Sequence, residues 1–157
     1  MHPDTMRFID RWAGIPLCFF TSLLIWKNKK TGIGAESNDT IVFIGIAEIG
    51  ALVVAYPAIQ EARKQHPQSR ICFITAPAGK QTLELMGFEE KDILLIRTSS
   101  IQNILGDIVK IRNVFKKVRV SAVVLEPFTR FSTLVATWIG ASKRLGCHRF
   151  LAEGVYL

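Results

Sequence analysis

Four charged residues of this chain follow short apolar runs, in places where a side chain can meet a ligand. Glu48 follows Ile41–Ile46, Lys80 follows Ile71–Thr75, Arg97 follows Ile93–Ile96, and Arg130 follows Ser121–Leu125. The three cations have the chemistry to hold phosphate groups, although most exposed lysines and arginines have no specific partner. Glu48 has a structural alternative as well, because acidic residues are favourable at the positive end of a helix. The elements that position these residues must therefore be considered.

The familiar cofactor and catalytic motifs are missing from these loops. Gly45–Gly50 reads GIAEIG rather than the dinucleotide pattern G-x-G-x-x-G. Gly79-Lys80 lacks the Ser or Thr and the upstream glycine of a phosphate-binding loop. No Ser/His/Asp or Cys/His arrangement is visible, and the cysteines (Cys18, Cys72, Cys147) and histidines (His2, His66, His148) lack metal-ligand spacing. We expect reduced cysteines, no metal and no cofactor.

Apolar runs alternate with helical patterns over residues 41–147. Strands are expected at Ile41–Ile46, Ile71–Thr75, Ile93–Ile96, Ser121–Leu125 and Arg144–Cys147. Helices are expected from Ile49 to about His66, after Pro77, from Ile101 to Val118, and from Phe131 to Ile139. Pro57 predicts a kink or a restart in the first helix. Gly87 and Gly140 are typical left-handed helix ends.

The helix that begins at Ile101 has a two-sided pattern. Ser99 or Ser100 is expected to cap it, and Thr129 is expected to cap the last helix. Its predicted buried face consists of Ile101, Ile104, Leu105, Ile108, Ile111, Phe115 and Val118. Its predicted solvent face consists of Gln102, Asn103, Asp107, Lys110 and Lys117. Phe131 and Trp138 of the last helix are expected in the core.

This alternation predicts an α/β fold, with a Rossmann-like parallel sheet and helices on both faces, because such units make right-handed crossovers. Parallel sheets of this kind bind ligands at the carboxyl ends of their strands. The loops expected there are Glu48–Ala51, Ala76–Lys80, Arg97–Ser100 and Glu126–Arg130. The charged residues are therefore expected along one edge of the sheet.

Amino-acid composition and net charge limit the classes of molecule that this chain could bind. Hydrophobic residues make up 49 % and charged residues 21 % of the 157 residues, as in folded proteins. The formal net charge of +7 suggests nucleic acid, anionic lipid or a phosphorylated substrate. The basic residues occur only in small clusters and no motif of a nucleic-acid reader is present, so nucleic acid is not the expected partner.

An uncharged apolar block, Trp12–Trp26, lies between basic residues near the N-terminus. It is shorter than the roughly 20 residues of a membrane span, and it ends in lysines rather than in a cleavage site. We predict an apolar helix over residues 1–30 that lies in an anionic membrane interface, a linker over 31–39, and a domain over 40–157. The protein would then be peripheral, on the cytoplasmic face of the inner (plasma) membrane. A helix packed on the protein's own surface is the alternative.

Residues 41–68 comprise an apolar strand, a short loop that ends in Ile49-Gly50, a helix with the step Pro57-Ala58-Ile59, and a basic finish before Pro67. This order, with its Pro-Ala-Leu-like step, resembles the opening of glycosyltransferase family 9, to which the heptosyltransferases belong. The leader that starts at Phe8 (FIDRWAGIPLC) resembles an extension of some members. The segment that starts at Arg144 (RLGCHRF) resembles the end of the family's first domain. The resemblance covers nearly the whole chain.

The resemblance implies the N-terminal half of a two-domain GT-B glycosyltransferase. That half receives the acceptor, which is a phosphorylated, lipid-linked saccharide of the lipopolysaccharide core in the best-known members. A C-terminal half, which this chain does not contain, binds the donor, ADP-heptose. The implied reaction needs no metal and inverts the anomeric centre. A base removes the proton of the acceptor hydroxyl, and cations stabilise the departing diphosphate.

One position departs from the family. Many members carry the acidic base directly after Ile-Gly, where this chain has Ala51. We hypothesise that Glu48, in the same loop, takes this role. We further expect the acceptor to contact Gly50 and Ala51 in the same loop, and its phosphates to meet Lys80, Arg97 and Arg130, which follow strands at the same crevice edge.

Two other functions stay open. Without a donor domain the chain would be an inactive, membrane-attached saccharide-binding module, so whether these 157 residues act as an enzyme is undecided. An unrelated Rossmann-like module that binds a nucleotide is the third possibility.

Overall fold

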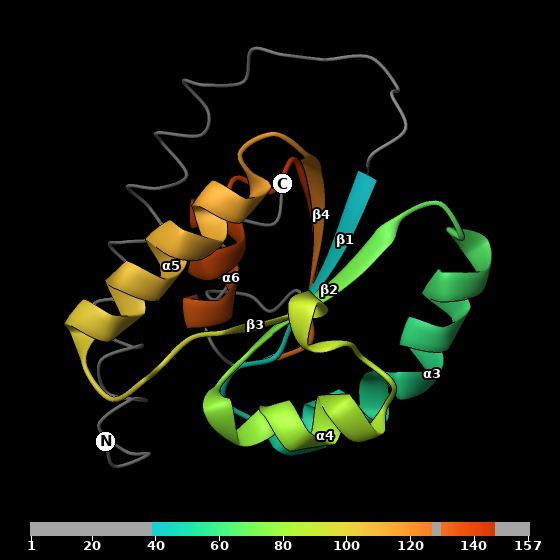
Figure 1. The fold of residues 1–157 in the computed structure, drawn as a ribbon, viewed down its shortest axis with the longest axis horizontal. Coiled ribbons are helices and arrows are strands. Elements are labelled where there is room, and N and C mark those ends of the chain that lie inside the picture. The colour runs from blue at the N-terminus through green and yellow to red at the C-terminus, as the bar shows by residue number, and fades with distance from the viewer. Residues whose placement is uncertain (1–38, 127–129, 147–157) are drawn as a thin grey trace.

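The computed structural model describes residues 39–126 and 130–146, which form a five-stranded sheet between two layers of helices (Figure 1). The strands are β1 (Asp39–Ile44), β2 (Arg70–Thr75), β3 (Ile93–Leu95), β4 (Arg119–Val124) and β5 (Lys143–Gly146). Their spatial order is β3-β2-β1-β4-β5, and all neighbours run parallel. The predicted Rossmann-like fold is confirmed.

The helices divide between the two faces of the sheet. They are α3 (Ile49–Gln65), α4 (Lys80–Leu85), α5 (Ile101–Phe115) and α6 (Arg130–Trp138), with short 3-10 turns at Pro77–Gly79 and Glu90–Asp92. Leu52, Ile59 and Leu83 of α3 and α4 form one core with Phe43 and Phe73 of the sheet. The helices α5 and α6 cover the other face through a second core.

The second core explains why the central strands are continuous apolar runs. Val42 and Ile44 of β1 and Ile74 of β2 point into it, packed against residues such as Ile108 and Val135 of α5 and α6. Alternate residues of the same strands point to the first core. Because side chains alternate across a strand, a strand covered on both faces must be apolar at every position.

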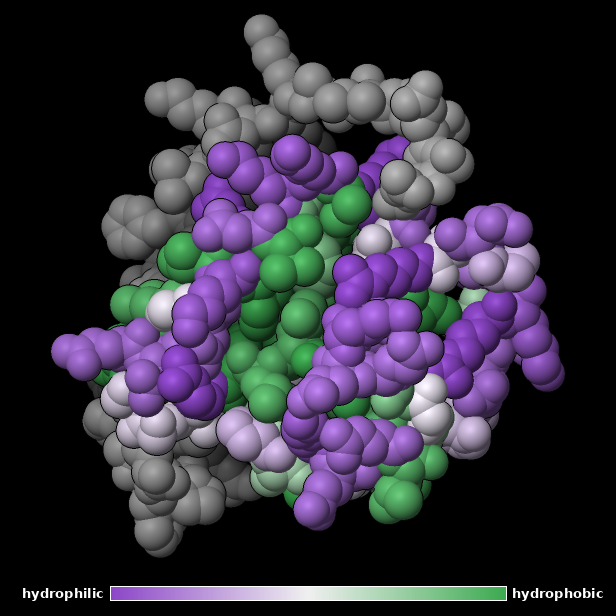
Figure 2. All heavy atoms as spheres, in the orientation of Figure 1, coloured by the Kyte–Doolittle hydropathy of each residue, from purple (hydrophilic) through white to green (hydrophobic). Residues whose placement is uncertain are grey.

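The edge strand β3 is short, with Ile93 buried and Leu94 and Leu95 half-buried. Figure 2 shows hydrophobic side chains gathered along this edge, between hydrophilic residues of α5 on one side and of the α4 side on the other. A short edge strand limits the row of unpaired backbone groups that another strand can join.

Of the kink or restart predicted at Pro57, the restart does not occur, because α3 runs from Ile49 to Gln65 and includes this proline. Pro57 has no N–H, so the helix loses one hydrogen bond to the carbonyl four residues earlier, on Val53. Val53 and Pro57 are both exposed. Solvent can therefore satisfy the freed carbonyl, and the helix tolerates the proline.

The predicted faces of α5 are partly wrong. Ile108, Ile111 and Phe115 are buried as expected, whereas Ile101 and Leu105 are 71 % and 50 % exposed. Asp107, predicted in solvent, is only 5 % exposed. The helix also ends at Phe115, so Val118 follows it rather than extending its buried face.

Two smaller features agree with the sequence, and a third differs in degree. The hydroxyl of Ser100 caps α5 by accepting a hydrogen bond from the N–H of Asn103 at 3.2 Å. Gly87 and Gly140 have φ values of 80° and 84°, the left-handed conformation predicted for both. Phe131 and Trp138 are half-buried against the core of α5 and α6 rather than fully inside it.

The N-terminal predictions and the cap at Thr129 lie outside the described residues. The first described residue, Asp39, already belongs to β1, one residue before the predicted domain start. Over residues 39–126 and 130–146, no helix is long and apolar enough to cross a bilayer.

A substitution at Gly79 tests the packing between the turn after β2 and helix α3. A Cβ added there would collide with the hydroxyl of buried Thr75 and lie 3.1 Å from Cδ1 of Leu52. We expect Gly79→Ala to lower the free energy of unfolding by about 1–3 kcal/mol, since overpacking forces a local shift. Urea denaturation followed by circular dichroism measures it.

Gly106 is the matched control, because it lies in the exposed interior of α5 and a Cβ there would meet no atom within 4 Å. Gly106→Ala should stabilise the protein by roughly 0.5–1 kcal/mol through helix propensity. Equal stability of Gly79→Ala and the unmodified protein would contradict the packing described.

Candidate functional site

The strand order creates a topological switch point between β1 and β4. The chain moves outward from β1 to β2 and β3, and α5 then returns it to the other side of β1. Ile44 and Val124 are paired at the carboxyl ends of these strands, and the N–H of Leu125 donates to the carbonyl of Ile44 at 3.0 Å. The loops that follow diverge here, as at the ligand sites of open α/β sheets. We call residues 45–48 and 125–126 the switch-point edge.

The carboxylate of Glu126 joins the two loops. One oxygen accepts hydrogen bonds from the N–H groups of Ala47 and Glu48, the latter at 3.1 Å. The other oxygen accepts a hydrogen bond from the hydroxyl of Ser132, on α6. Glu126 is 2 % exposed and Ser132 is fully buried. A negative charge in this place satisfies N–H groups at the start of α3 and complements the positive end of that helix.

Glu48, the predicted base, occupies the N-cap position of α3 with extended backbone angles. Its own side chain makes no capping hydrogen bond and is exposed. Glu126 accepts the hydrogen bond of the Glu48 backbone N–H, and the Glu48 carboxylate itself stays exposed at the switch-point edge. A carboxylate in such a place has the chemistry to take a proton from a bound hydroxyl group.

Gly50 and Ala51 lie in the first turn of α3, next to Glu48. Gly50 is exposed, and a Cβ added to it would have no atom within 4 Å. Ala51 is half-buried, and its N–H donates to the carbonyl of Glu48 at 3.2 Å. The side chain of Ala51 is a methyl group, so it can contact a ligand but cannot accept a proton.

Lys80 begins α4, after β2, and belongs to an ion-pair cluster. Its ammonium lies 2.6 Å from a carboxylate oxygen of Glu90 and 3.7 Å from one of Glu84. The hydrogen bond with Glu90 raises the pKa of Lys80 and lowers that of Glu90. Because both carboxylates are well exposed, a ligand phosphate can compete with them for the lysine.

Arg97 follows β3 and is held by Asp107 of α5. Its Nη2 and Nε donate to the two carboxylate oxygens at 2.7 and 2.9 Å, and its backbone N–H donates to the same carboxylate at 3.0 Å. The guanidinium lowers the pKa of Asp107. This two-pronged pair explains why Asp107 is buried on a helix flank that the sequence assigned to solvent.

Arg130 is the first residue of α6, on the β4 side of the switch-point edge, and it is half-buried with interactions of its own. The predicted residues therefore lie beyond the carboxyl ends of four different strands. Glu48 and Arg130 follow the neighbouring strands β1 and β4, whereas Lys80 and Arg97 follow β2 and β3 and are occupied by separate acidic partners.

Sequence reasoning missed Glu126, Ser132 and Asp107. A usable signal existed for Glu126, because it is a carboxylate directly after a buried apolar strand, where open α/β sheets gather polar groups. No local signal identifies Ser132 or Asp107. Both sit in helical patterns, and their partners come from elsewhere in the chain.

The described residues offer no site for a metal ion, since no group of three His, Cys, Asp or Glu side chains comes together among them. Cys72 is a free, buried thiol in β2. Burial raises its pKa to about 11, which makes the reactive thiolate scarce at neutral pH.

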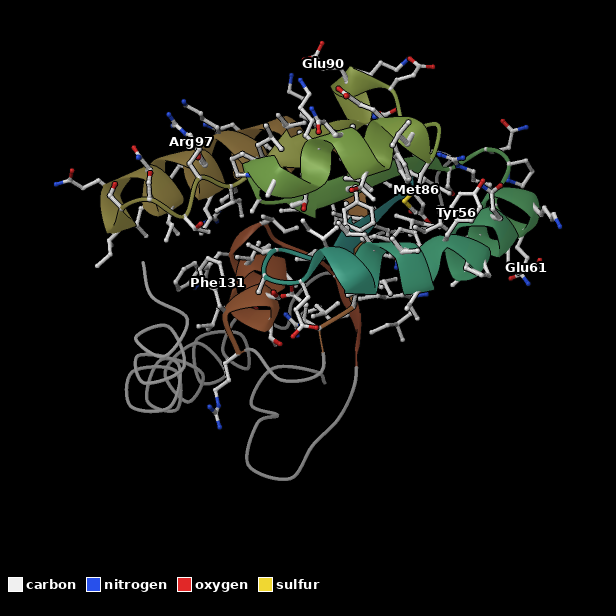
Figure 3. All side chains as sticks on the ribbon, turned by 90° about the horizontal axis from the view of Figure 1, so that it is seen from below. Tyr56, Glu61, Met86, Glu90, Arg97 and Phe131 are labelled. Atoms are coloured by element: carbon white, nitrogen blue, oxygen red, sulfur yellow. The ribbon has the colours of Figure 1, made fainter. Side chains whose placement is uncertain are left out.

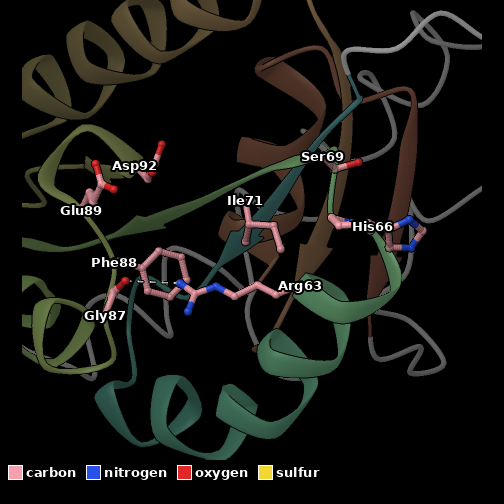
Figure 4. Close-up of a pocket in the computed structure, with 9 residues that line it drawn as sticks. Arg63, His66, Ser69, Ile71, Gly87, Phe88, Glu89 and Asp92 are labelled. Carbon is pink, nitrogen blue, oxygen red and sulfur yellow. Dashed lines mark hydrogen bonds between the residues drawn. The ribbon is translucent and has the colours of Figure 1, made fainter.

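A separate hollow of about 420 Å³ lies at the opposite, amino end of the sheet, beside the end of α3 (Figure 4). Arg63 lies 4.6 Å from the ring centre of Phe88, and its Nη2 is 3.5 Å from the carbonyl of Gly87. Two carboxylates of the hollow, Glu89 and Asp92, are paired with lysine and arginine side chains. These contacts anchor α3 to the loop before β3, and no predicted site residue lines the hollow.

Removal of the Glu126 carboxylate tests its bridging role. We expect Glu126→Ala to lower the free energy of unfolding by roughly 2–4 kcal/mol, because the N–H groups of Ala47 and Glu48 and the buried hydroxyl of Ser132 lose their acceptor. Urea denaturation of Glu126→Ala, Ser132→Ala and the double variant measures the coupling. The double variant should cost less than the sum of the two single variants.

Glu61→Ala is the control, since Glu61 is an exposed carboxylate on α3 that should change stability by no more than about 0.5 kcal/mol. Strict additivity of the Glu126 and Ser132 substitutions would show that the two side chains act independently.

Comparison with known proteins gives a likeness of structure. No protein-family model and no curated protein sequence matches the chain. The crystal structure of the glycosyl transferase family 9 from Veillonella parvula DSM 2008 superposes with a TM-score of 0.55 and 16 % sequence identity. The superposition covers 74 % of this chain and 34 % of that one, so the match spans about a third of the length of the Veillonella protein. The likeness shows that the two chains share a fold.

Proposed function

We propose that this chain is the acceptor-binding part of a glycosyltransferase that moves a heptose or a similar sugar from a nucleotide sugar to a phosphorylated, lipid-linked saccharide. The observation that carries the proposal is the fold shared with a protein described as a family 9 glycosyl transferase. The family-like order of residues 41–68, which builds β1 and α3 at the switch-point edge, supports it independently.

In this proposal the acceptor lies along the carboxyl ends of the strands. Arg130 and Lys80 bind its phosphates, with Lys80 exchanging the exposed Glu90 for the ligand. Arg97, whose side chain stays 51 % exposed beside Asp107, contributes the part of its guanidinium that Asp107 does not occupy. Gly50 and Ala51 contact the acceptor next to its reacting hydroxyl group. A second domain binds the donor, an ADP-heptose-like nucleotide sugar.

Glu48 is the proposed base. Its carboxylate is exposed, and the loop that carries it is fixed by the backbone hydrogen bonds to Glu126. A fixed backbone with a free side chain suits a group that must reach a hydroxyl and withdraw a proton. Cations of the site and of the donor domain would stabilise the negative charge of the leaving diphosphate.

A non-catalytic saccharide-binding module is the second candidate, and Ala51 at the position of the family's acid is the observation that favours it. A nucleotide-binding module of the dinucleotide type is less well supported. In that class the first N–H groups of the helix after β1 receive a phosphate. In this chain the buried carboxylate of Glu126 lies against the N–H groups of Ala47 and Glu48 directly before α3. Its negative charge opposes a phosphate at the start of that helix.

Acceptor binding is the first test. The chain should bind a phosphorylated lipid A–core saccharide in the absence of any donor. Enzymatic removal of the phosphates should weaken binding at least tenfold, because each charge-assisted hydrogen bond contributes about 1.5–3 kcal/mol. Isothermal titration calorimetry measures both affinities. Binding of ADP-sugar more tightly than of the saccharide would support a nucleotide module and refute the proposal.

A measurement of sugar transfer tests whether Glu48 is the base. In a protein that joins this chain to its donor domain, Glu48→Gln should lower kcat by a factor of 10² or more, since an amide cannot act as a base. Glu61→Gln on the outer part of α3 is the matched control and should leave turnover unchanged. If Glu48→Gln turns over normally with an intact circular dichroism spectrum, Glu48 is not the base and acceptor binding alone remains.

A further inference from the structure

One flank of α5 exposes apolar and basic side chains in a single row. Ile101, Leu105 and Val109 are 71 %, 50 % and 57 % exposed. Arg112 and Lys116 continue the row and are also exposed. Steps of three and four residues bring these side chains to the same side of a helix. We call these five residues the α5 flank.

The charges on and around the α5 flank are positive. Between Ile101 and Arg119 the chain contains one carboxylate, Asp107, whose side chain is 7 % exposed and paired with Arg97. The neighbouring Lys110 and Lys117 are exposed cations. Cations near the end of a helix are favourable because of the helix dipole. That effect does not explain the exposed isoleucine, leucine and valine in the same row, which remain costly in water.

The charges indicate which partner covers the flank. The apolar block Trp12–Trp26 of this chain is bordered by Arg11 and Lys27, so it brings cations toward Arg112 and Lys116 rather than the opposite charge. A nucleic acid would match the cations, but the flank offers it aliphatic side chains instead of the aromatic rings on which bases stack. An anionic lipid surface matches both halves of the row, with phosphates for the cations and acyl chains for the aliphatic groups.

We propose that the α5 flank is a membrane-contact surface for anionic phospholipid. Ile101, Leu105 and Val109 enter the boundary between headgroups and acyl chains, and Arg112 and Lys116 bind lipid phosphates. The start of β1 lies at the same end of the molecule as the end of α5, because Asp39 pairs in register with Arg119. A membrane-bound segment before β1 and the flank can therefore engage one surface. The inference goes beyond the proposed sugar transfer and does not require it.

Vesicle binding by the full chain tests the proposal. Co-sedimentation with vesicles of phosphatidylcholine and phosphatidylglycerol should be strong, and it should be weak with phosphatidylcholine alone or at high salt. Arg112→Gln/Lys116→Gln should lower the partition coefficient roughly 30-fold, because each basic residue at an anionic surface contributes about 1 kcal/mol. No acceptor or donor is present, so failure here is separate from failure of the glycosyltransferase proposal.

The matched control is Lys64→Gln/Lys143→Gln, which removes the same charge from two exposed positions on α3 and β5, outside the α5 flank. It should retain nearly all of the binding. An equal loss in both double variants, the absence of binding to anionic vesicles, or tight RNA binding without vesicle binding would each overturn the proposal.

A fluorescent label distinguishes the flank from the N-terminal block. Cys18→Ser/Cys147→Ser leaves the buried Cys72, whose raised pKa keeps it unreactive. An environment-sensitive dye on Leu105→Cys should shift to the blue when anionic vesicles are added. The same dye on Glu61→Cys, on α3 and well away from α5 (Figure 3), should not shift.

Two outcomes of the labelling experiment contradict the proposal. If the protein binds vesicles but the dye at position 105 does not respond, binding belongs to another segment. If the dye is already shielded before vesicles are added and does not change, the protein covers the flank with its own chain.

Discussion

The buried carboxylate of Glu126 holds the two sides of the switch point together. A carboxylate at this depth must be compensated by donors, and it receives them from the loop after β1 and from α6. Because these donors belong to opposite layers of helices, the same contact fixes α3 relative to α6 across the end of the sheet. It also sets the backbone of Glu48, so the direction in which that side chain leaves the helix depends on Glu126. The geometry of the candidate site thus rests on one hydrogen-bonded group.

The cations of the site differ in how easily a ligand can recruit them. The partner of Lys80, Glu90, is 81 % exposed, and water can solvate it once the lysine turns away. The partner of Arg97, Asp107, is 7 % exposed and would be left as a nearly buried, uncompensated charge. Asp107 therefore holds the Arg97 side chain in position, and a phosphate can approach only the side of the guanidinium that does not face Asp107. Lys80 is the adaptable cation, and Arg97 is the fixed one.

The sequence reveals the parts of this fold that depend on local pattern. Runs such as Ile41–Ile46 identify strands because a strand covered on both faces is apolar throughout, and Gly87 and Gly140 identify helix ends because their backbone angles require glycine. Features that depend on distant partners were missed or misplaced. Asp107 is predicted to face solvent until Arg97 is placed beside it, and Glu126 is predicted to be a loop residue until the start of α3 is placed beside it. The exposure of Leu105 depends on which side of α5 packs against the sheet. The apolar residues of α5 cover more of the helix surface than the sheet contacts, so the sequence pattern alone cannot identify the side that is buried.

The central position of β1 has a consequence for synthesis of the protein. This strand pairs on one side with β2, the next strand made, and on the other side with β4, in a register that matches Asp39 with Arg119. Until the ribosome has delivered β4, one edge of this central strand is open, and the nascent sheet consists of β3, β2 and β1 alone. Contacts between distant parts of a chain form late because loop closure costs entropy. The growing chain therefore passes through a stage in which β1, the central strand of the finished sheet, is an unprotected edge strand. At this stage, association with other chains competes with folding.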